Sequence, residues 1–512
     1  MIVFFLGKIN IISNNFSMNK ICINNKVLDS QQTNVVLCDA RDILVVAGAG
    51  SGKTLTIVGK VKYLIEKKKI LPEEILCISF CNDSVNSLMN KLKEYNIDIM
   101  TFHKLGLNIL KEELESFSIC NNDYLEYVTK EFLFGIVFEN KRIMKNILRY
   151  FGVFSFFSIE KKYKIFIHTN YKKVISFSKL ITKFIRLFKT NNYSISSFID
   201  FKKSTFIKKE KLFLSIVFNV YLIYKNELDS SGLIDFDDML IKSTTFVDKN
   251  DSINKYKYII VDEYQDTSYI RYLLIKKIID KTNAKFMAVG DDFQSIYRFS
   301  GCDLEIFTLF NNFFNESKIL KIENTYRNSQ ELINVAGNFV MKNKLQIKKE
   351  LKSNKSVLKP IKVCYNCSLK RLIKMIKGNI MILGRNNKDI YEVIDNNFVL
   401  NKDKSILYKE DSSIKLKYMT VHGSKGLECD NVIILNVIDD ELGFPNKIED
   451  DKILRFVSKK DYKTLYDEER RLFYVALTRT KNNVYLITKK NRESIFIKEL
   501  IKDYYKYIEI IK

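Results

Sequence analysis

Residues 46–54 read Val-Ala-Gly-Ala-Gly-Ser-Gly-Lys-Thr, directly after the apolar run Asp42-Ile-Leu-Val-Val46 and directly before an amphipathic stretch. Small residues let backbone N–H groups converge on an anion, and a helix starting near Lys53 directs the positive end of its dipole to the same place. The order of strand, loop and helix predicts a phosphate-binding P-loop. We expect Lys53 to bind the β and γ phosphates of a nucleoside triphosphate and Thr54 to ligate Mg²⁺.

The loop departs from the usual pattern at its first position. The first glycine of G-x-x-x-x-G-K-[ST] is Ala47 here, where a small residue matters more than a positive φ. A merely flexible glycine loop is the alternative, and the flanking strand and helix patterns disfavour it. The residues predicted to bind the nucleotide in this loop are Ala47, Gly48, Ala49, Gly50, Ser51, Gly52, Lys53 and Thr54.

The composition is that of a globular protein with a polyanionic partner. The chain has 512 residues, 46% of them hydrophobic and 28% charged, which favours about two to four domains. A formal net charge of +24 favours nucleic acid, because each Lys or Arg on a phosphate releases condensed counterions. Part of the excess of positive charge has a different explanation. Trp is absent and Lys, Asn and Ile are abundant throughout, as in a genome whose overall composition has drifted.

The cysteines and the apolar runs limit the location of the protein. The cysteines are scattered singly, apart from Cys364 and Cys367 and the looser pair Cys77 and Cys81. No His lies near Cys364, so no structural zinc is predicted. Reduced thiols indicate an intracellular protein, cytoplasmic if the source is bacterial. No apolar run reaches membrane-spanning length. Residues 1–18 are predicted to be an N-terminal extension, with Met18 as an alternative start.

Strand and helix patterns divide the chain. From Asp42 to about Leu110 they alternate as in a parallel sheet, and the rhythm returns after residue 257. Residues 112–225 have helical spacing and no chemical motif, which predicts a helical insertion. Its basic clusters could meet a phosphate backbone or be solvated helix faces. The charged stretch Lys342–Lys359 is a weak low-complexity candidate and does not read as a linker. Strands are predicted at residues 43–46, 75–80, 258–261, 286–289, 379–383, 415–421, 432–435 and 484–488.

A second motif supplies carboxylates. Tyr258-Ile-Ile-Val-Asp-Glu-Tyr-Gln-Asp-Thr-Ser268 is an apolar strand that ends in two acids, where a P-loop sheet presents them beside the phosphates. Asp262 is then expected to hold Mg²⁺, and Glu263 to orient or deprotonate the attacking water. An ordinary exit from a strand into a loop is the alternative.

Further motifs identify a family. Val289-Gly-Asp-Asp-Phe-Gln-Ser-Ile-Tyr-Arg-Phe-Ser-Gly-Cys-Asp303 resembles the third motif of UvrD/Rep-type superfamily 1A DNA helicases, and others stand in the family's order. Leu28–Val36 resembles the Q motif, and Asn324-Thr-Tyr-Arg327 resembles motif IV. Ile78–Asn82 and Thr101–His103 are similar to motifs Ia and Ib, Leu233–Met239 to the acidic segment before the second motif, Tyr418–Glu428 to motif V, and Glu468–Arg479 to motif VI.

The resemblance implies roles for residues on both sides of a nucleotide cleft. Gln32 is expected to read the adenine edge and Tyr326 to stack on its face. Arg327 and Arg479 are expected to reach the γ-phosphate as arginine fingers. Gln294 is the expected sensor between hydrolysis and the nucleic acid, and Glu428 is expected near the ribose.

The resemblance also implies a track for single-stranded DNA, made of aromatic faces under the bases and polar groups on the backbone. Phe299 could instead be core, but its polar loop disfavours that. The candidates for this track are Phe80, Asn82, Thr101, His103, Tyr297, Phe299, Thr420 and His422.

Some positions depart from the family pattern. Leu55 replaces an Arg that sandwiches the adenine, and Phe299 and Ser300 replace a Trp and an Arg. The form of motifs III, IV and V is most similar to the helicase IV branch. A second insertion, large in UvrD and Rep, is expected to be much reduced here.

The implied architecture is α/β, with two RecA-like parallel-sheet lobes. Residues 19–111 and 226–318 are expected to form the first lobe, 112–225 a helical insertion in it, and 319–512 the second lobe, with a short insertion near 388–417. The implied activity is ATP- and Mg²⁺-dependent 3′-to-5′ DNA unwinding, in repair, recombination or replication. The alternatives are a translocase that removes bound proteins without unwinding and a nucleotide-gated nucleic-acid binder. Single-stranded and tailed double-stranded DNA are the expected partners, with no membrane and a monomer when free.

Overall fold

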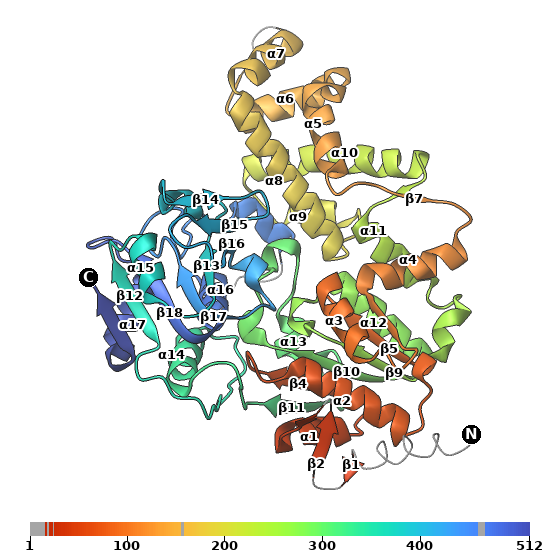
Figure 1. Ribbon diagram of the computed structural model, residues 1–512. Helices are drawn as coiled ribbons and strands as arrows, with labels where there is room; N and C mark the ends of the chain where they lie inside the picture. The colour runs from red at the N-terminus through yellow and green to blue at the C-terminus, as the bar shows by residue number, and fades with distance from the viewer. Residues whose placement is uncertain (1–15, 18–19, 24, 155–157, 459–465) are drawn as a thin grey trace.

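A computed structural model describes residues 16–17, 20–23, 25–154, 158–458 and 466–512. Two sheets covered by helices form two neighbouring lobes, and a group of helices projects from one end of the molecule (Figure 1). The predicted N-terminal extension, residues 1–18, lies outside the described residues except for β1 (Phe16–Ser17), which pairs with β2 (Lys20–Ile23). Among the described residues, no helix combines the length and the apolar character that crossing a membrane requires.

The first lobe is built on a fully parallel sheet of six strands in the order β11-β4-β10-β9-β5-β6. Its apolar strands are buried on both faces, as parallel strands require. Ile43 and Val45 of β4 pack with α1, α2 and α3, whereas Leu44 and Val46 pack with α4, α11 and α12. The strands are β4 (Asp42–Ala47), β5 (Ile75–Ser79), β6 (Asp98–Thr101), β9 (Tyr258–Val261), β10 (Lys285–Gly290) and β11 (Lys318–Ile322). The helices are α1 (Ser30–Leu37), α2 (Lys53–Glu66), α3 (Asn82–Lys91), α4 (Phe102–Glu113), α11 (Phe236–Phe246), α12 (Tyr269–Thr282) and α13 (Glu305–Thr308).

The helical insertion extends slightly past its expected end. Its strands β7 (Ser118–Ile119) and β8 (Leu233–Ile234) pair where the chain leaves and re-enters the first lobe. At this base, the buried Lys189 forms ion pairs with the partly exposed Asp235 and Asp238. The helices are α5 (Tyr124–Phe134), α6 (Lys141–Tyr150), α7 (Ile159–Thr169), α8 (Tyr171–Thr190), α9 (Ser197–Lys203) and α10 (Lys208–Ser230).

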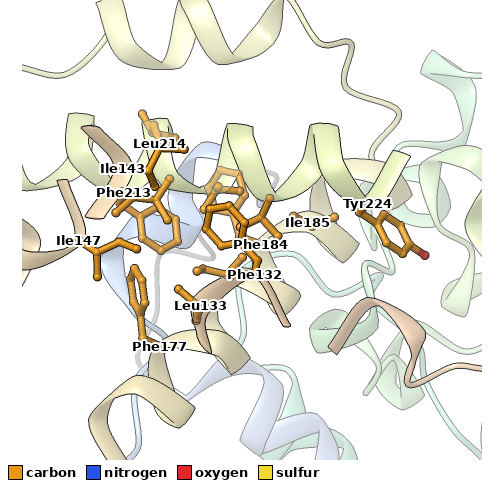
Figure 2. Packing of buried hydrophobic residues seen from close by; sticks show 14 of the residues in the cluster. Phe132, Leu133, Ile143, Ile147, Phe177, Phe184, Ile185, Phe213, Leu214 and Tyr224 are labelled. Carbon is orange, nitrogen blue, oxygen red and sulfur yellow. The ribbon is translucent and has the colours of Figure 1, made fainter. Parts of the chain in front are cut away.

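The insertion has its own aromatic core. Figure 2 shows Phe132, Phe177, Phe184 and Phe213 packed between its helices. The ring centroids of Phe184 and Phe213 lie 5.5 Å apart in an edge-on arrangement, one of the geometries that aromatic pairs prefer. Periodic apolar residues over α5–α10 therefore form a separate core, and the composition change at residue 112 marks it.

A segment of the second lobe completes that core. Residues 448–458, here called the latch, place Ile453, Leu454 and Val457 among the insertion's buried side chains. Asn191 Nδ2 donates to the Val457 carbonyl at 2.8 Å, and Arg455 forms a two-pronged ion pair with Glu210. The insertion is thus attached to the first lobe through the chain and to the second lobe through packing.

Replacing Leu454 with alanine is expected to lower the free energy of unfolding by about 2–5 kcal/mol, the usual cost of a cavity at a buried leucine. Leu454 is only 3% exposed. Urea denaturation measures the effect. Leu442→Ala is the matched control, because Leu442 is 52% exposed and should cost little. Equal midpoints for the two variants would mean that the latch does not contribute to the core.

The second lobe has an eight-stranded sheet in the order β14-β15-β16-β13-β17-β18-β12-β19. Along this order, all neighbouring strands from β16 through β13, β17, β18 and β12 to β19 are parallel. Strands β14 and β15 form an antiparallel hairpin at the edge next to β16. The strands are β12 (Ile361–Tyr365), β13 (Ile380–Gly384), β14 (Phe398–Leu400), β15 (Ser405–Tyr408), β16 (Leu416–Thr420), β17 (Cys429–Ile434), β18 (Thr480–Thr488) and β19 (Ile508–Ile511). The helices are α14 (Gln330–Val340), α15 (Leu369–Met375), α16 (Asp467–Leu477) and α17 (Ile495–Tyr504).

These sheets confirm the α/β class. The structure adds detail at two places: the expected end of the first lobe and the expected short insertion in the second. Strand β11 begins at the expected end of the first lobe and pairs with β4, so the first sheet continues to Ile322. The short insertion expected near 388–417 contains the hairpin β14–β15, which widens the second sheet.

Candidate nucleotide and nucleic-acid sites

The loop after β4 has the backbone of a phosphate cradle. Gly50 and Gly52 have φ values of 72° and 82°, a left-handed conformation that glycine adopts without strain. Helix α2 starts at Lys53 with no side chain capping its first turn, so its free N–H groups can bind an anion. The Ser51 hydroxyl is buried without a hydrogen-bond partner among the described atoms. These features fit a bound phosphate group.

Residues from two distant segments border this loop. Gln32 is buried at the start of α1, where it forms a capping box with Asp29, and its Nε2 donates to the Ser51 carbonyl at 2.9 Å. Tyr326 donates its backbone N–H to the Gly50 carbonyl at 3.0 Å and its hydroxyl to Asp29 at 2.7 Å. Its side chain is half-exposed. Both residues expected to bind adenine therefore contact the P-loop or its neighbours, and Asp29, which joins them, escaped the sequence analysis.

The acid pair lies where β9 ends. Lys53 Nζ is 3.2 Å from Glu263 Oε1, so the P-loop and the second motif meet directly. Burial and the adjacent Glu263 carboxylate raise the pKa of Asp262, whereas Lys53 and Lys425 outweigh burial and lower the pKa of Glu263. Glu263 is therefore ionised at neutral pH.

Thr54 and Asp262 lie at the same edge of the first sheet, because both follow parallel strands that end there. A hydroxyl and a carboxylate are oxygen ligands of the kind that Mg²⁺ prefers, and phosphate oxygens and water usually complete its shell. The donor set fits this ion.

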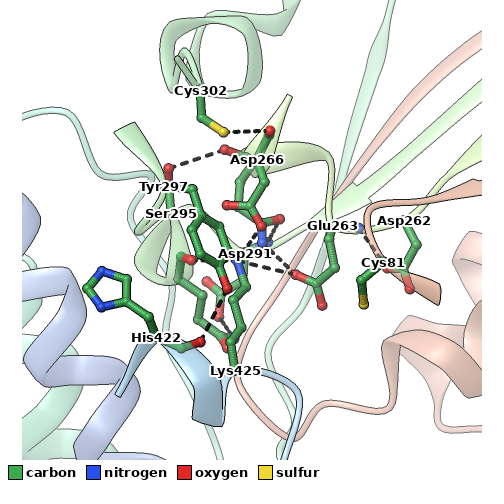
Figure 3. Close-up of polar contacts among 12 residues, drawn as sticks. Cys81, Asp262, Glu263, Asp266, Asp291, Ser295, Tyr297, Cys302, His422 and Lys425 are labelled. Atoms are coloured by element: carbon green, nitrogen blue, oxygen red, sulfur yellow. Dashed lines mark hydrogen bonds and ion pairs between the residues drawn. The ribbon is translucent and has the colours of Figure 1, made fainter. Parts of the chain in front are cut away.

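Lys425 of the second lobe reaches into the same group of carboxylates. Figure 3 shows it beside Asp266 and Glu263; it forms an ion pair with Asp266, and its Nζ lies 3.9 Å from Glu263 Oε2. It also donates to the Gln294 carbonyl at 2.8 Å. Sequence reasoning missed Lys425, although it lies within the quoted motif V, as it missed Gln265, which bridges Glu263 and the Asp291 backbone.

The two candidate arginine fingers lie on the second-lobe side of the cleft. Arg327 Nε donates to Glu428 at 2.8 Å, and the Arg327 Cβ would lie 2.5 Å from a Cβ added at Gly50. Arg479 is 1% exposed, and its Nη2 donates to Gln294 Oε1 at 2.9 Å. Burial, and then Arg327, lower the pKa of Arg479 to about 9, so it remains a cation at neutral pH. Their contact with a γ-phosphate stays a prediction.

Four of the residues expected to bind DNA form one cluster, here called the aromatic patch: Phe80, Tyr297, Phe299 and His422. Phe80 stacks on Tyr297 at 5.5 Å between centroids, and Phe299 meets His422 edge-on at 5.5 Å. The Tyr297 hydroxyl donates to the His422 carbonyl at 3.2 Å, which joins the two lobes (Figure 3). Phe299 is 52% exposed and is therefore available to a ligand.

The other four candidates are more scattered. The Thr101 hydroxyl caps α4 by accepting from Lys104, and His103 lies edge-on to Phe236 at 5.3 Å. Asn82 is exposed at the first turn of α3, and the Thr420 hydroxyl accepts from Gly423. Their contact with DNA stays a prediction. Arg271, which sequence reasoning missed, places its guanidinium 4.9 Å from the Phe80 ring centroid.

Comparison with known proteins links these clusters to a family. The model of the UvrD/REP helicase N-terminal domain matches residues 28–315. DNA helicase IV of Escherichia coli (strain K12) is 26% identical in an alignment of length 503 that covers 93% of this chain and 70% of that protein. The ATP-dependent DNA helicase Rep of Buchnera aphidicola subsp. Acyrthosiphon pisum (strain APS) is 31% identical in an alignment of length 336 that covers 63% of this chain and 46% of that protein.

A probable DNA helicase II homolog of Mycoplasma capricolum subsp. capricolum is 28% identical in an alignment of length 459 that covers 85% of this chain and 55% of that protein. The chain thus spans about half the length of the Rep and helicase II relatives named here. The predicted branch, helicase IV, is represented among the relatives.

The match to the family model extends over more than half of the chain. It contains the P-loop, the Asp262–Glu263 pair and Gln294. Within it, Glu263 lies near Lys425 of the second lobe and Gln294 accepts from Arg479 of the second lobe. The chain belongs to the UvrD/REP helicase family.

Proposed function

We propose that this protein is an ATP-dependent DNA helicase that moves 3′ to 5′ along single-stranded DNA. The residues of the cleft are suited to phosphoryl transfer to water, which needs positioning and charge stabilisation more than covalent chemistry. Glu263 would orient the attacking water. Thr54 and Asp262 would hold Mg²⁺, which neutralises charge on the phosphate oxygens.

One observation carries the proposal. The third motif joins the candidate nucleotide site to the aromatic patch within a few residues. Gln294 contacts Arg479, and Tyr297 contacts Phe80 and His422. Lys425 reinforces this link, since it contacts both the Gln294 carbonyl and the acids of the second motif. If the arginine side chains move after ATP is hydrolysed, the aromatic patch would therefore change as well. This connection supports coupling between ATP turnover and movement on DNA.

Strand displacement tests the proposal. Duplexes with a 3′ tail, a 5′ tail or no tail are incubated with ATP and Mg²⁺, with Glu263→Gln as the inactive control. The expected result is displacement from the 3′-tailed substrate alone. Displacement only from the 5′-tailed substrate would contradict the polarity, and an active ATPase that displaces none would contradict unwinding.

A second candidate is a translocase that strips proteins from single strands. It is favoured by the short hairpin β14–β15, which stands where a large second insertion occurs in UvrD and Rep. Release of streptavidin from a biotinylated single strand, without duplex unwinding, would support it. A nucleotide-gated binder would show neither activity and no ATPase stimulation by single strands.

Phe299→Ala is expected to weaken single-strand binding by about 1–3 kcal/mol, because a base loses one stacking face. Fluorescence anisotropy of a labelled oligonucleotide measures the affinity. Phe206→Ala is the matched control, since Phe206 is a 93%-exposed phenylalanine of the helical insertion. An unchanged affinity for Phe299→Ala would remove Phe299 from the proposed DNA track.

A further inference from the structure

A buried group of three charges, Lys349, Asp291 and Asp292, lies beside Gln294. Lys349 Nζ forms ion pairs with Asp291 and, at 2.6 Å, with Asp292, and none of the three side chains is exposed. The same Nζ lies 3.6 Å from the centroid of the Phe293 ring. Burying charges is costly, and removing one partner leaves another charge uncompensated. Each of the three charges is therefore needed to offset the burial of the others.

Lys349 belongs to a segment that crosses the cleft. Residues 343–355, here called the strap, follow α14 in the charged stretch that the sequence analysis left without a role. Asn343 donates to the Asp467 carbonyl at the start of α16, and Thr325 next to Arg327 donates to the Lys352 carbonyl. Leu351 covers the P-loop, with its Cδ2 2.4 Å from a Cβ added at Gly48. Gln346 of the strap accepts from Arg471 of motif VI. The strap therefore touches the P-loop and motifs III, IV and VI.

The carboxylate of Asp291 connects Lys349 to the candidate sensor. Its Oδ1 accepts from Lys349 and from the Phe293 backbone, and its Oδ2 accepts from Gln294 Nε2 at 2.6 Å. A carboxylate only accepts hydrogen bonds, so the amide nitrogen of Gln294 must face Asp291. The amide oxygen then faces the opposite way, where Arg479 Nη2 donates to it at 2.9 Å.

Lys349, Asp291, Gln294 and Arg479 thus form one hydrogen-bonded chain, in which Asp291 accepts from both Lys349 and Gln294, and Gln294 accepts in turn from Arg479. We propose that Lys349 is a positioning residue: by holding Asp291 it fixes the orientation of Gln294 that receives the Arg479 guanidinium. The role rests on the proposed function, because it concerns the arginine that would act in ATP hydrolysis. The Lys349 ammonium is held by Asp291 and Asp292, so Lys349 would act through these carboxylates and not on the nucleotide itself.

Lys349→Met tests this role, because methionine has a similar length and no charge. The expected result is a fall of about 10- to 100-fold in single-strand-stimulated kcat, the scale of a misplaced catalytic group. The Kd of a fluorescent ATP analogue should stay within about threefold, since Lys53 and Gln32 keep their contacts. An unchanged kcat, or a loss confined to Kd, would overturn the proposal.

A double-mutant cycle separates positioning from folding. If Lys349 acts through Gln294, then Lys349→Met should lower kcat no further in a Gln294→Ala background. Equal losses in both backgrounds would overturn the proposal. Should Lys349→Met fold poorly, Lys349→Met with Asp292→Asn removes one charge of each sign. This pair should fold and stay slow, and a return to the normal kcat would show that Lys349 only balances charge.

The two proposals fail differently in this experiment. A wild-type protein without single-strand-stimulated ATPase would contradict the proposed function. A wild-type protein that is active, is slowed by Gln294→Ala and is unaffected by Lys349→Met would contradict the positioning role alone.

Discussion

Lys53→Ala is expected to lower single-strand-stimulated ATP hydrolysis by at least about 10³-fold, the scale on which a charge at the transferred phosphoryl group acts. The P-loop would lose the ammonium that neutralises the β and γ phosphates. It would also lose the 3.2 Å ion pair with Glu263, which leaves that carboxylate in a buried position with Lys425 at 3.9 Å. Release of inorganic phosphate measures the rate.

A matched control lies just beyond the same helix. Lys68→Ala removes a surface lysine that pairs with Asp39, and the rate of hydrolysis should not change. Turnover by Lys53→Ala at the rate of the Lys68→Ala control would reject the assignment of the nucleotide site.

Arg479→Ala is expected to reduce kcat by about 10³-fold or more, as the loss of an arginine finger does. The affinity for ATP should change by only a few fold, because the P-loop and Gln32 remain. In the structure Arg479 also donates to the carbonyls of Leu427 and Val475, so it is held rigidly beside Gln294. Arg479→Lys keeps the charge and loses the planar fork, and it should be nearly as slow.

Single-turnover hydrolysis and nucleotide titration measure the two quantities for Arg479 separately. Arg492→Ala is the control, because Arg492 forms a surface pair with Asp440 and should not affect either. If Arg479→Ala weakened binding and left single-turnover hydrolysis normal, the finger role would be wrong for this residue.

The central sheet strands and the two nucleotide motifs were predictable because their signals are local. The continuous apolar runs before Ala47 and Asp262 match β4 and β9, and all eight predicted strand positions contain a strand of the structure. The strands of the two sheets that were missed are β6, β11, β12, β14, β15 and β19, since each is short and most contain a charged or polar residue. A single sequence gives such segments no clear period.

The strap shows why other parts of the site could not be predicted. Lys349 stands in a lysine-rich stretch whose composition indicates an exposed surface, yet its side chain is wholly buried. The charges that make this burial possible are 57 and 58 residues away in sequence. The latch is similar, because Ile453, Leu454 and Val457 form too short an apolar run among charged residues to suggest a core. Only tertiary contacts define these segments.

The latch constrains how the two lobes can move. The insertion is anchored to the first lobe by the ion pair of the buried Lys189 with Asp235 and to the second lobe by Leu454, Val457 and Arg455. While both attachments hold, we expect the lobes to turn about an axis that passes near the insertion. The P-loop, between β4 and α2, lies well away from the outer helices α6 and α7 (Figure 1). Because displacement grows with distance from the axis, a small rotation would change the separation of the lobes most at the nucleotide site.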